Sequence, residues 1–465
     1  MEIWQGFWEF SISIDQMMLQ LGILIVAFLI GNMIRRKVGF IKKSLIPTSI
    51  IGGIIILLLK IIPYFRNLLT NEFMEAITYH ALGLGTIALA LKSSPKGKVK
   101  ERNREVMNAG LITVNSYLIQ GIFGGLITAA LAATFMSGLL PASGLLLPLG
   151  FGQGSGQALS WGTIYETEWG FTGGASFGLT VAGIGFLVAC LFGLVHIIVQ
   201  KKRGKIVVTD QSDALVTIDE FTAPNDVPLT ESVDRFTIQM ALIILVYFLT
   251  FLVIKGVVKL DAGNFVEKTV KPMIVGFNFL IGTFFAILVK KAFDVFKKTN
   301  LMTRDYPNNY LLNRISGFCF DFMMLAGIGA IQISVLKGLL IPLILICVVG
   351  TLVTYLYVYK TSKYCFPGYV EESFLSLFGT LTGTYSTGII LLREIDSKFE
   401  TPAANNLIFQ ATYAIMFGWP IFLLLGYAPI GLIETLITVG ILIVLFVAFN
   451  VLLYRQKLFA KKTKA

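Results

Sequence analysis

Two polar, glycine-rich stretches interrupt an otherwise apolar chain, and both carry groups that can bind small ions. The first spans residues 151–166 and combines glycines with amide and hydroxyl side chains. Glycine lets backbone N–H and C=O groups approach a ligand closely, and the N–H groups at a helix start suit a carboxylate. We therefore predict substrate contacts from Gly152, Gln153, Gly154, Ser155, Gly156 and Gln157.

The second stretch spans residues 378–388 and is rich in hydroxyl side chains. It begins 227 residues after the first (378 − 151), which is close to half the chain length. Hydroxyl and carbonyl oxygens are hard ligands, which suit Na⁺. We predict substrate contacts from Thr382, Gly383 and Thr384, and cation contacts from Thr380, Thr384 and Ser386. The competing interpretation is a pair of ordinary polar loops at a membrane surface.

Two further polar residues belong to the candidate site. Asp321 lies well inside an apolar run, where an acid is costly and therefore indicates binding of Na⁺ or H⁺. A structural acid, paired or close to the membrane surface, explains it equally well. Asn405 opens the helix that follows the second stretch, where it either contacts substrate or caps the helix.

Sequence patterns of enzyme chemistry are absent. The chain has no HExxH, no GxGD and no P-loop, so we predict no enzyme activity and no ATP-driven transport. Four cysteines without CxxC spacing and two histidines predict no metal centre apart from Na⁺, and no other cofactor. An ion gradient remains as the driving force.

The composition indicates a polytopic membrane protein. The 465 residues are 55% hydrophobic with mean hydropathy +0.77, and only 14% are charged, against roughly 25% in soluble domains. Apolar runs of about 20 residues recur, as expected for spanning helices in a lipid bilayer. The net charge of +11 comes from basic loops beside these runs. It therefore follows the positive-inside rule and predicts no nucleic-acid partner.

Hydropathy and loop charge predict eleven spanning helices. They cover residues 16–33, 44–62, 73–91, 107–134, 172–199, 235–257, 272–289, 315–335, 339–359, 403–425 and 430–454. Every strongly basic loop then falls on one side, which puts the N-terminus outside and the C-terminus in the cytoplasm.

The two halves are predicted to form an inverted repeat of 5 + 5 helices with an extra C-terminal helix. An odd number of helices per half inverts the second half, and each polar stretch lies between the fourth and fifth helix of its half. We expect re-entrant hairpins at 138–166 and 366–396, which approach from opposite sides. The predicted units are a first repeat at 1–200, a cytoplasmic linker at 201–234, a second repeat at 235–426, and a C-terminal helix with a basic tail at 427–465.

These residues resemble the sodium/glutamate symporter family of bacterial secondary carriers. The resemblance rests on the stretch from Gly152 to Glu166, on residues 383–403 and on the third predicted helix, with Gln153 where the family usually has histidine. It implies Na⁺-coupled uptake of glutamate across the bacterial inner membrane, a moving transport domain and a homodimer. The hairpins and the inversion also follow from the residues themselves.

Our interpretation is an elevator-like, cation-coupled symporter for a small organic anion, with glutamate or a related acidic amino acid first. The alternative is a cation/proton antiporter that uses Asp321. A passive channel is a third class, although opposed hairpins and the lack of a charged pore ring argue against it.

Overall fold

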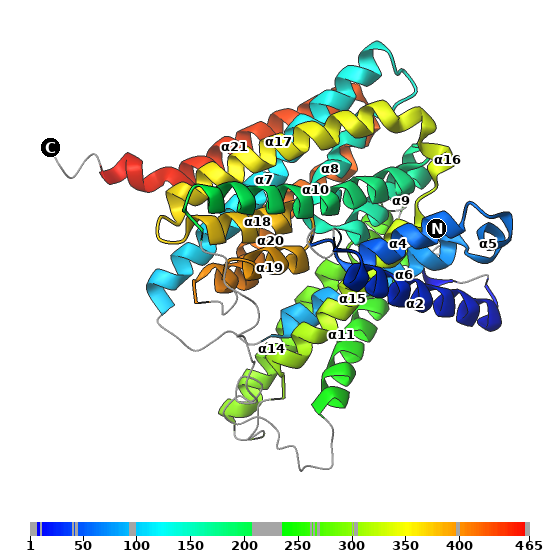
Figure 1. The fold of residues 1–465 in the computed structure, drawn as a ribbon, viewed down its shortest axis with the longest axis horizontal. Helices are drawn as coiled ribbons and strands as arrows, with labels where there is room; N and C mark the ends of the chain where they lie inside the picture. Colours follow the sequence, from blue (N-terminus) through cyan, green and yellow to red (C-terminus); the bar gives the residue numbers. More distant parts are fainter. Residues whose placement is uncertain are drawn as a thin grey trace.

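The structure, a computed structural model, describes most of the chain. It covers residues 7–9, 12–39, 41, 45–92, 99–206, 235–260, 263, 266, 270–299, 301, 306–396 and 400–460. All regular secondary structure in this part of the chain is helical (Figure 1). The predicted linker at 201–234 lies outside the described residues, apart from its first six positions.

The first half contains one broken pair of helices. The bounds of the helices in this half are α2 (Ile14–Lys37), α4 (Thr48–Leu59), α5 (Pro63–Leu68), α6 (Asn71–Leu91), α7 (Val99–Thr134), the short 3₁₀ turn η1 (Pro141–Leu145), α8 (Leu146–Gln153), α9 (Ser155–Trp169) and α10 (Gly174–Lys202). The first polar stretch is therefore helix α8, a break at one glycine, and helix α9. This broken pair packs against α6, α7 and α10.

The second half also contains a broken pair of helices. The bounds of the helices in this half are α11 (Arg235–Val258), α13 (Lys271–Gly276), α14 (Asn278–Lys298), α15 (Asn309–Ala330), α16 (Ile333–Leu336), η5 (Lys337–Leu339), α17 (Leu340–Cys365), α18 (Val370–Thr382), α19 (Tyr385–Arg393), α20 (Ala403–Tyr427), η6 (Ala428–Ile430) and α21 (Leu432–Ala460). The second polar stretch is also a broken pair, α18 and α19.

Nine helices among the described residues are long and apolar enough to cross a membrane. The predicted spans at 44–62 and 272–289 are not among them. The first is shortened because α4 has only 12 residues and Pro63 starts a new helix. Proline is favoured at this position because a residue in the first turn of a helix does not use its backbone N–H for a helical hydrogen bond. The second, α14, carries the charged residues Lys290, Lys291 and Asp294 within its length, before the two lysines of its last turn.

The predicted helix at 315–335 also ends early, at Ala330. The carbonyl of Gly329 accepts a hydrogen bond from the Lys60 ammonium at 3.0 Å instead of continuing the helical ladder. The N–H of Gln332 donates to the Ser176 hydroxyl at 3.0 Å. Partners on other helices therefore satisfy the backbone groups that a longer helix would use.

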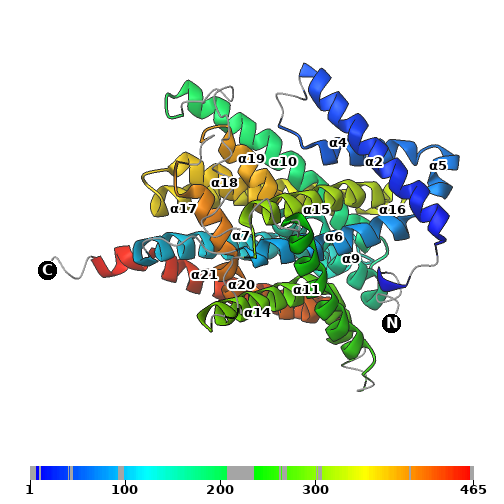
Figure 2. The ribbon, with the colours of Figure 1, turned by 90° about the horizontal axis from the view of Figure 1, so that it is seen from below.

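Two pairs of corresponding helices form the centre of the molecule. Helix α6 packs against α15, and α7 packs against α17, α20 and α21. Helix α15 also packs on α4, and α6 packs on α14, so the α6–α15 pair contacts a further helix from each half. Figure 2 shows α2 with α4 on one side of the α6–α15 pair and α11 with α14 on the other.

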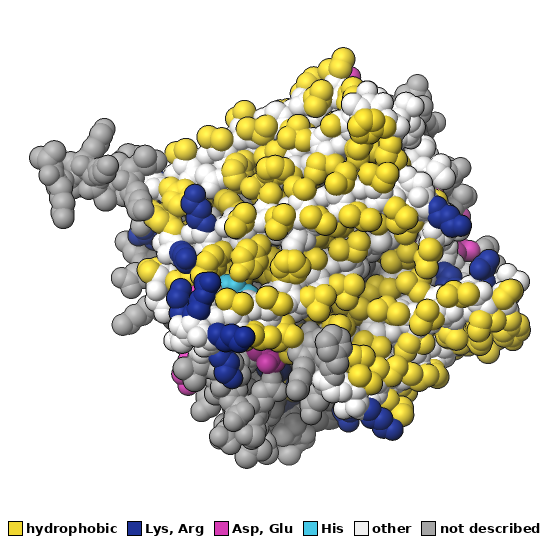
Figure 3. Space-filling view, turned by 45° about the horizontal axis from the view of Figure 1, so that its top comes forward, with side chains coloured by type: hydrophobic (Ala, Val, Ile, Leu, Met, Phe, Trp, Pro, Cys, Tyr) yellow, Lys and Arg dark blue, Asp and Glu magenta, His cyan; other side chains and the backbone are white. Residues whose placement is uncertain are grey.

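The outer surface of these helices is apolar. Figure 3 shows hydrophobic side chains over most of one face, with Lys and Arg gathered at its edges. Helices α17 and α21 contribute large exposed side chains to the surface, among them Ile341, Leu356, Ile433 and Val444. An apolar band of this kind needs lipid around it, which fits a multi-pass membrane protein.

Candidate substrate and ion site

The break in the first polar stretch lies at Gly154. Its backbone has φ +82° and ψ −174°, a conformation that is essentially restricted to glycine. Helix α8 ends on one side of it and α9 begins on the other at Ser155. The first N–H groups of α9 have no helical acceptor, so the break presents hydrogen-bond donors and the positive end of a helix dipole.

The residues around this break are held by neighbouring helices. Gly152 allows the ring of Tyr117 on α7 to approach, because a Cβ there would lie 2.1 Å from that ring. The Tyr117 hydroxyl donates to the Gly152 carbonyl at 3.0 Å. Gly156 lies against Leu82 of α6. Gln153 is half-buried at the end of α8.

The second break lies at Gly383 and Thr384, between α18 and α19. The amide of Gln120 on α7 donates to the Leu381 carbonyl at 3.0 Å and to the Thr354 hydroxyl at 2.8 Å. It thereby satisfies one of the carbonyls that the end of α18 leaves free. Helix α19 starts at the residue after Thr384, so this break also presents a helix N-terminus.

The structure brings the two breaks together, although they are 230 residues apart (384 − 154). A Cβ built on Gly154 would lie 3.2 Å from Thr384 Cγ2 and 3.3 Å from Met323 Cε. The Ser155 hydroxyl donates to the Met323 carbonyl at 3.1 Å, which ties the start of α9 to α15. Phe186 of α10 contacts both breaks. Two helix N-termini therefore start at one place in the interior.

Gln157, on the first turn of α9, is the most informative side chain near the breaks. It is 1% exposed, and neither its Nε2 nor its Oε1 has a hydrogen-bond partner among the described residues. An unpaired buried amide costs about 1–3 kcal/mol per group, so native proteins rarely keep one without a purpose. Gln157 therefore carries a buried donor and a buried acceptor that the described part of the protein leaves unused.

The predicted hydroxyl ligands differ in position. The Thr380 and Thr382 hydroxyls donate to carbonyls of their own helix at 2.8 Å, to Ser376 and Phe378 respectively, which leaves their oxygen lone pairs as acceptors. Thr384 lies at the break, with its Oγ1 3.4 Å from Thr387 Oγ1.

Ser386 is half-buried in the first turn of α19, and Asn405 is half-buried in the first turn of α20. Thr380 packs inside the α18–α19 pair, because a Cβ on Gly388 would lie 2.2 Å from its Oγ1. Of the predicted second-stretch residues, Gly383 and Thr384 therefore lie at the break itself.

The structure does not bring Asp321 to the breaks. Its carboxylate accepts a hydrogen bond from the Ser49 hydroxyl of α4 at 3.0 Å. Met323 of the same helix faces the breaks. Asp321 lies two residues before it, which is a rotation of about 200° around the helix axis. The Asp321 side chain therefore points to the other side of α15. Its predicted role in ion binding receives no geometric support.

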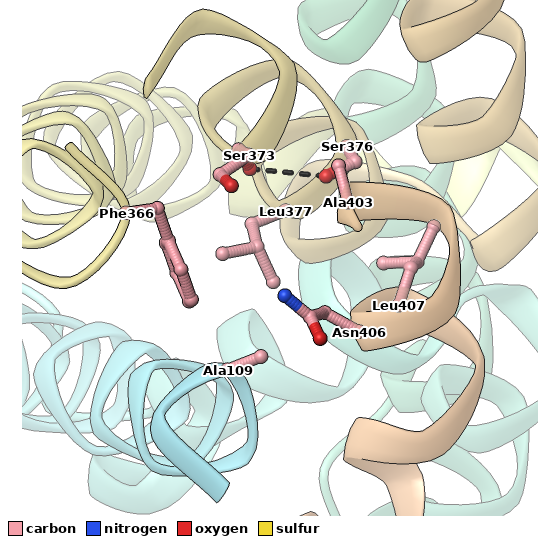
Figure 4. A pocket seen from close by; sticks show the side chains of 8 residues that line it. All are labelled: Ala109, Phe366, Ser373, Ser376, Leu377, Ala403, Asn406 and Leu407. Carbon is pink, nitrogen blue, oxygen red and sulfur yellow. Dashed lines mark hydrogen bonds between the residues drawn. The ribbon is translucent and has the colours of Figure 1, made fainter. Parts of the chain in front are cut away.

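A small pocket lies near Asn406, the neighbour of Asn405, between α7, α18 and α20 (Figure 4). It has no room for a water molecule, and it is lined by Ala109, Phe366, Ser373, Ser376, Leu377, Ala403, Asn406 and Leu407. In Figure 4 the Leu377 side chain projects between Ser373 and Asn406, so their polar groups do not converge. The pocket is a packing gap and not a ligand site.

The Asn406 amide has a structural partner instead. Its Nδ2 donates to the Tyr369 hydroxyl at 2.9 Å, and that hydroxyl donates to the Glu105 carboxylate at 2.7 Å. Burial, reinforced by Glu105, raises the pKa of Tyr369 far above its usual value, so the tyrosine keeps the proton that it donates. This chain of bonds joins α7 to the start of α18 and α20.

Sequence reasoning missed a buried contact between a histidine and a carboxylate in the first turn of α18. His196 Nε2 of α10 lies 2.7 Å from Glu371 Oε2 of α18, and its Nδ1 lies 2.8 Å from the Tyr355 hydroxyl of α17. The sequence did carry a signal for this contact, because an ionisable residue in an apolar stretch, such as His196, is costly to bury and indicates a partner. Met323, Phe186 and Tyr117 carried no such signal, because residues of these types are common in any membrane helix.

Comparison with known proteins identifies the family of the chain. The family model described as sodium/glutamate symporter matches residues 12–365, which is more than half of the chain and includes the first broken pair. The second broken pair lies beyond the matched residues. No curated protein matches the chain. The extent of the family match shows that this chain belongs to the sodium/glutamate symporter family of membrane transporters.

Proposed function

We propose that this protein couples Na⁺ entry to the uptake of a small organic anion, with glutamate or a related acidic amino acid first. The observation that carries the proposal is the meeting of two helix N-termini at Gly154 and Thr384. Free N–H groups and two positive dipole ends favour a carboxylate at this point. The buried, unpaired amide of Gln157 supplies a further donor and acceptor for an amino acid.

Oxygen atoms for Na⁺ lie in the same region. The hydroxyls of Thr380 and Thr384 and the half-buried Ser386 offer lone pairs. The Gln120 Oε1 is buried and has no hydrogen-bond partner among the residues that the structure describes. Hard oxygen ligands of this kind suit a small cation. A bound Na⁺ would also offset the negative charge of the substrate.

We propose that the fold is an inverted repeat with two re-entrant hairpins, at 138–166 and 366–396. A reciprocal pair of lysine contacts supports this proposal. Lys60 of α4 donates to the last turn of α15, at the Gly329 carbonyl, and Lys290 of α14 donates to the end of α6, at the Ala90 carbonyl. Each lysine therefore comes from α4 or α14, the helix that precedes α6 or α15 in its own half apart from the short α5, and binds the end of the corresponding helix of the other half.

The proposal also covers the orientation of the protein in the membrane and its transport mechanism. Basic residues close the last turns of α2, α10 and α14, so we place these ends in the cytoplasm, with the N-terminus outside. We propose an inner-membrane location, and alternating access by movement of the broken pairs with α6 and α15. An elevator mechanism and a homodimeric scaffold rest on the family resemblance.

Antiport through Asp321 finds less support than symport. The carboxylate is held by Ser49 and points away from both breaks, as described above. An antiporter would need this acid to exchange with the solution on each side in turn.

Uptake into proteoliposomes tests the proposal. We expect accumulation of labelled L-glutamate, or of another acidic amino acid or dicarboxylate in a panel, when an inward Na⁺ gradient is imposed. Vesicles with equal Na⁺ on both sides, and protein-free vesicles, are the controls. Failure of every anion in the panel to accumulate with either a Na⁺ or an H⁺ gradient would refute symport.

A further inference from the structure

Lys92, at the end of α6, is a buried cation without a counter-charge. It is 9% exposed, and its ammonium donates to the Asn313 side-chain oxygen at 3.2 Å. In the part of the chain that the structure describes, no carboxylate lies within ion-pair distance of it. A neutral amide is a weak partner for a desolvated ammonium, since buried charges are normally paired.

A second ammonium increases the positive charge at this end of α6. The Lys290 Nζ lies 2.9 Å from the Lys92 carbonyl and 3.2 Å from the Ala90 carbonyl. Burial lowers the pKa of Lys92 to about 8, so the group still carries its charge at neutral pH. Asp294 lies close enough to Lys290 to offset its charge, so Lys92 is the ammonium of this pair that has no acid beside it among the described residues.

Lys92 is also close to the second break. Its ammonium lies 6.0 Å from the centre of the Tyr385 ring, within the range of a cation–π contact. Tyr385 is the first residue of α19, directly after Thr384, which contacts Gly154. One aromatic side chain thus lies between the ammonium and the place where the two broken pairs meet.

From this position we infer that Lys92 binds a carboxylate of the transported anion on its way between the broken pairs and the cytoplasm. The inference rests on the proposed function and adds a second, inner contact to it. The anion supplies the missing counter-charge of Lys92, while Asn313 holds the ammonium in place between substrates. Tyr385 lies beside the ammonium and separates it from the central site.

Sided kinetics test this role. The variants are Lys92→Met, which removes the charge, and Lys92→Arg, which keeps it. Lys291→Met is the matched control, because Lys291 is exposed on α14, next to Lys290. The KM for L-glutamate, or for whichever panel anion the wild type carries, is measured from each face in oriented proteoliposomes.

Loss of a charge-assisted hydrogen bond predicts that Lys92→Met raises the KM at the cytoplasmic face by at least about tenfold. The KM at the external face should stay within about twofold, and Lys92→Arg should recover most of the loss. Lys291→Met should resemble the wild type at both faces. Thermal melting of Lys92→Met should show no loss of stability, because a buried unpaired charge has been removed.

Two results would overturn the inference and leave symport standing. One is an unchanged cytoplasmic KM in Lys92→Met, and the other is an equal rise at both faces, which would place Lys92 in the central site. Absence of transport by the wild type for every anion would instead refute the proposed function, and the inference with it.

Discussion

Replacement of Gly154 by alanine perturbs the point where the two broken pairs meet. The residue has φ +82° and ψ −174°, and a side chain in that region costs about 1–3 kcal/mol. The new Cβ would also lie 3.2 Å from Thr384 and 3.3 Å from Met323, so these neighbours must move by a few tenths of an ångström. Both effects act against the arrangement in which the helix N-termini face one another.

The expected effect of Gly154→Ala on transport follows from this cost. If the strain falls on the binding-competent arrangement, about 1–3 kcal/mol corresponds to a 5- to 150-fold loss in kcat/KM. Initial rates of Na⁺-driven glutamate uptake into proteoliposomes, normalised to folded protein, measure it.

Gly170→Ala provides the matched control. Gly170 also has a positive φ, +69°, but it lies at the far end of α9 with no atom within 4 Å of its Cβ position. It should lower stability by about 1 kcal/mol and leave transport intact. Wild-type transport by Gly154→Ala, or an equal loss in both variants, would refute the reasoning about the break.

Four further variants or conditions give separate tests. Gln157→Leu should raise the KM for substrate about tenfold. It should also increase the melting temperature of the ligand-free protein, because it removes an unpaired buried amide. A lowered melting temperature would contradict this expectation. His196→Leu leaves the buried Glu371 carboxylate without its histidine partner and should lower the free energy of unfolding by about 1–3 kcal/mol, with recovery when Glu371→Leu is added. A double variant as unstable as the single one would show that the contact is not the cause. The pKa of Lys92 is lower in the folded state than in the unfolded state, so the folded protein loses this proton first as the pH rises. The free energy of unfolding should therefore increase between about pH 8 and 10.5. Melting curves should show a smaller increase for Lys92→Met. Asp321→Asn should leave the substrate KM within about twofold, because its carboxylate faces α4; a large rise would return Asp321 to the site.

Much of the architecture could be predicted because membrane helices leave strong local signals. Long apolar runs and flanking basic residues marked the spans, and glycine with polar neighbours marked the two interruptions in α8–α9 and α18–α19. The family assignment is confirmed by the family match, which covers residues 152–166 and the third helix but ends before residues 383–403. Glycine at position 154 could be recognised as unusual, although its positive φ could not be foreseen.

The remaining features depend on contacts between distant parts of the chain. The early end of α15 follows from Lys60 binding the Gly329 carbonyl, a pairing across 269 residues. Similarly, the orientation of Asp321 towards Ser49 depends on how α4 packs on α15. Hydropathy reports which residues avoid water, but it does not report which side of a buried helix meets which partner.

Substrate protection at the break tests the central claim most directly. Gln153→Cys, in a background without the four native cysteines, places a thiol on a half-buried residue beside Gly154. Thr167→Cys, exposed at the far end of α9, is the control. If the anion and Na⁺ bind between the broken pairs, the two together should slow labelling at position 153 by about tenfold or more and leave position 167 unchanged. Equal labelling of position 153 with and without ligands, in protein that still transports, would contradict a site between the two breaks.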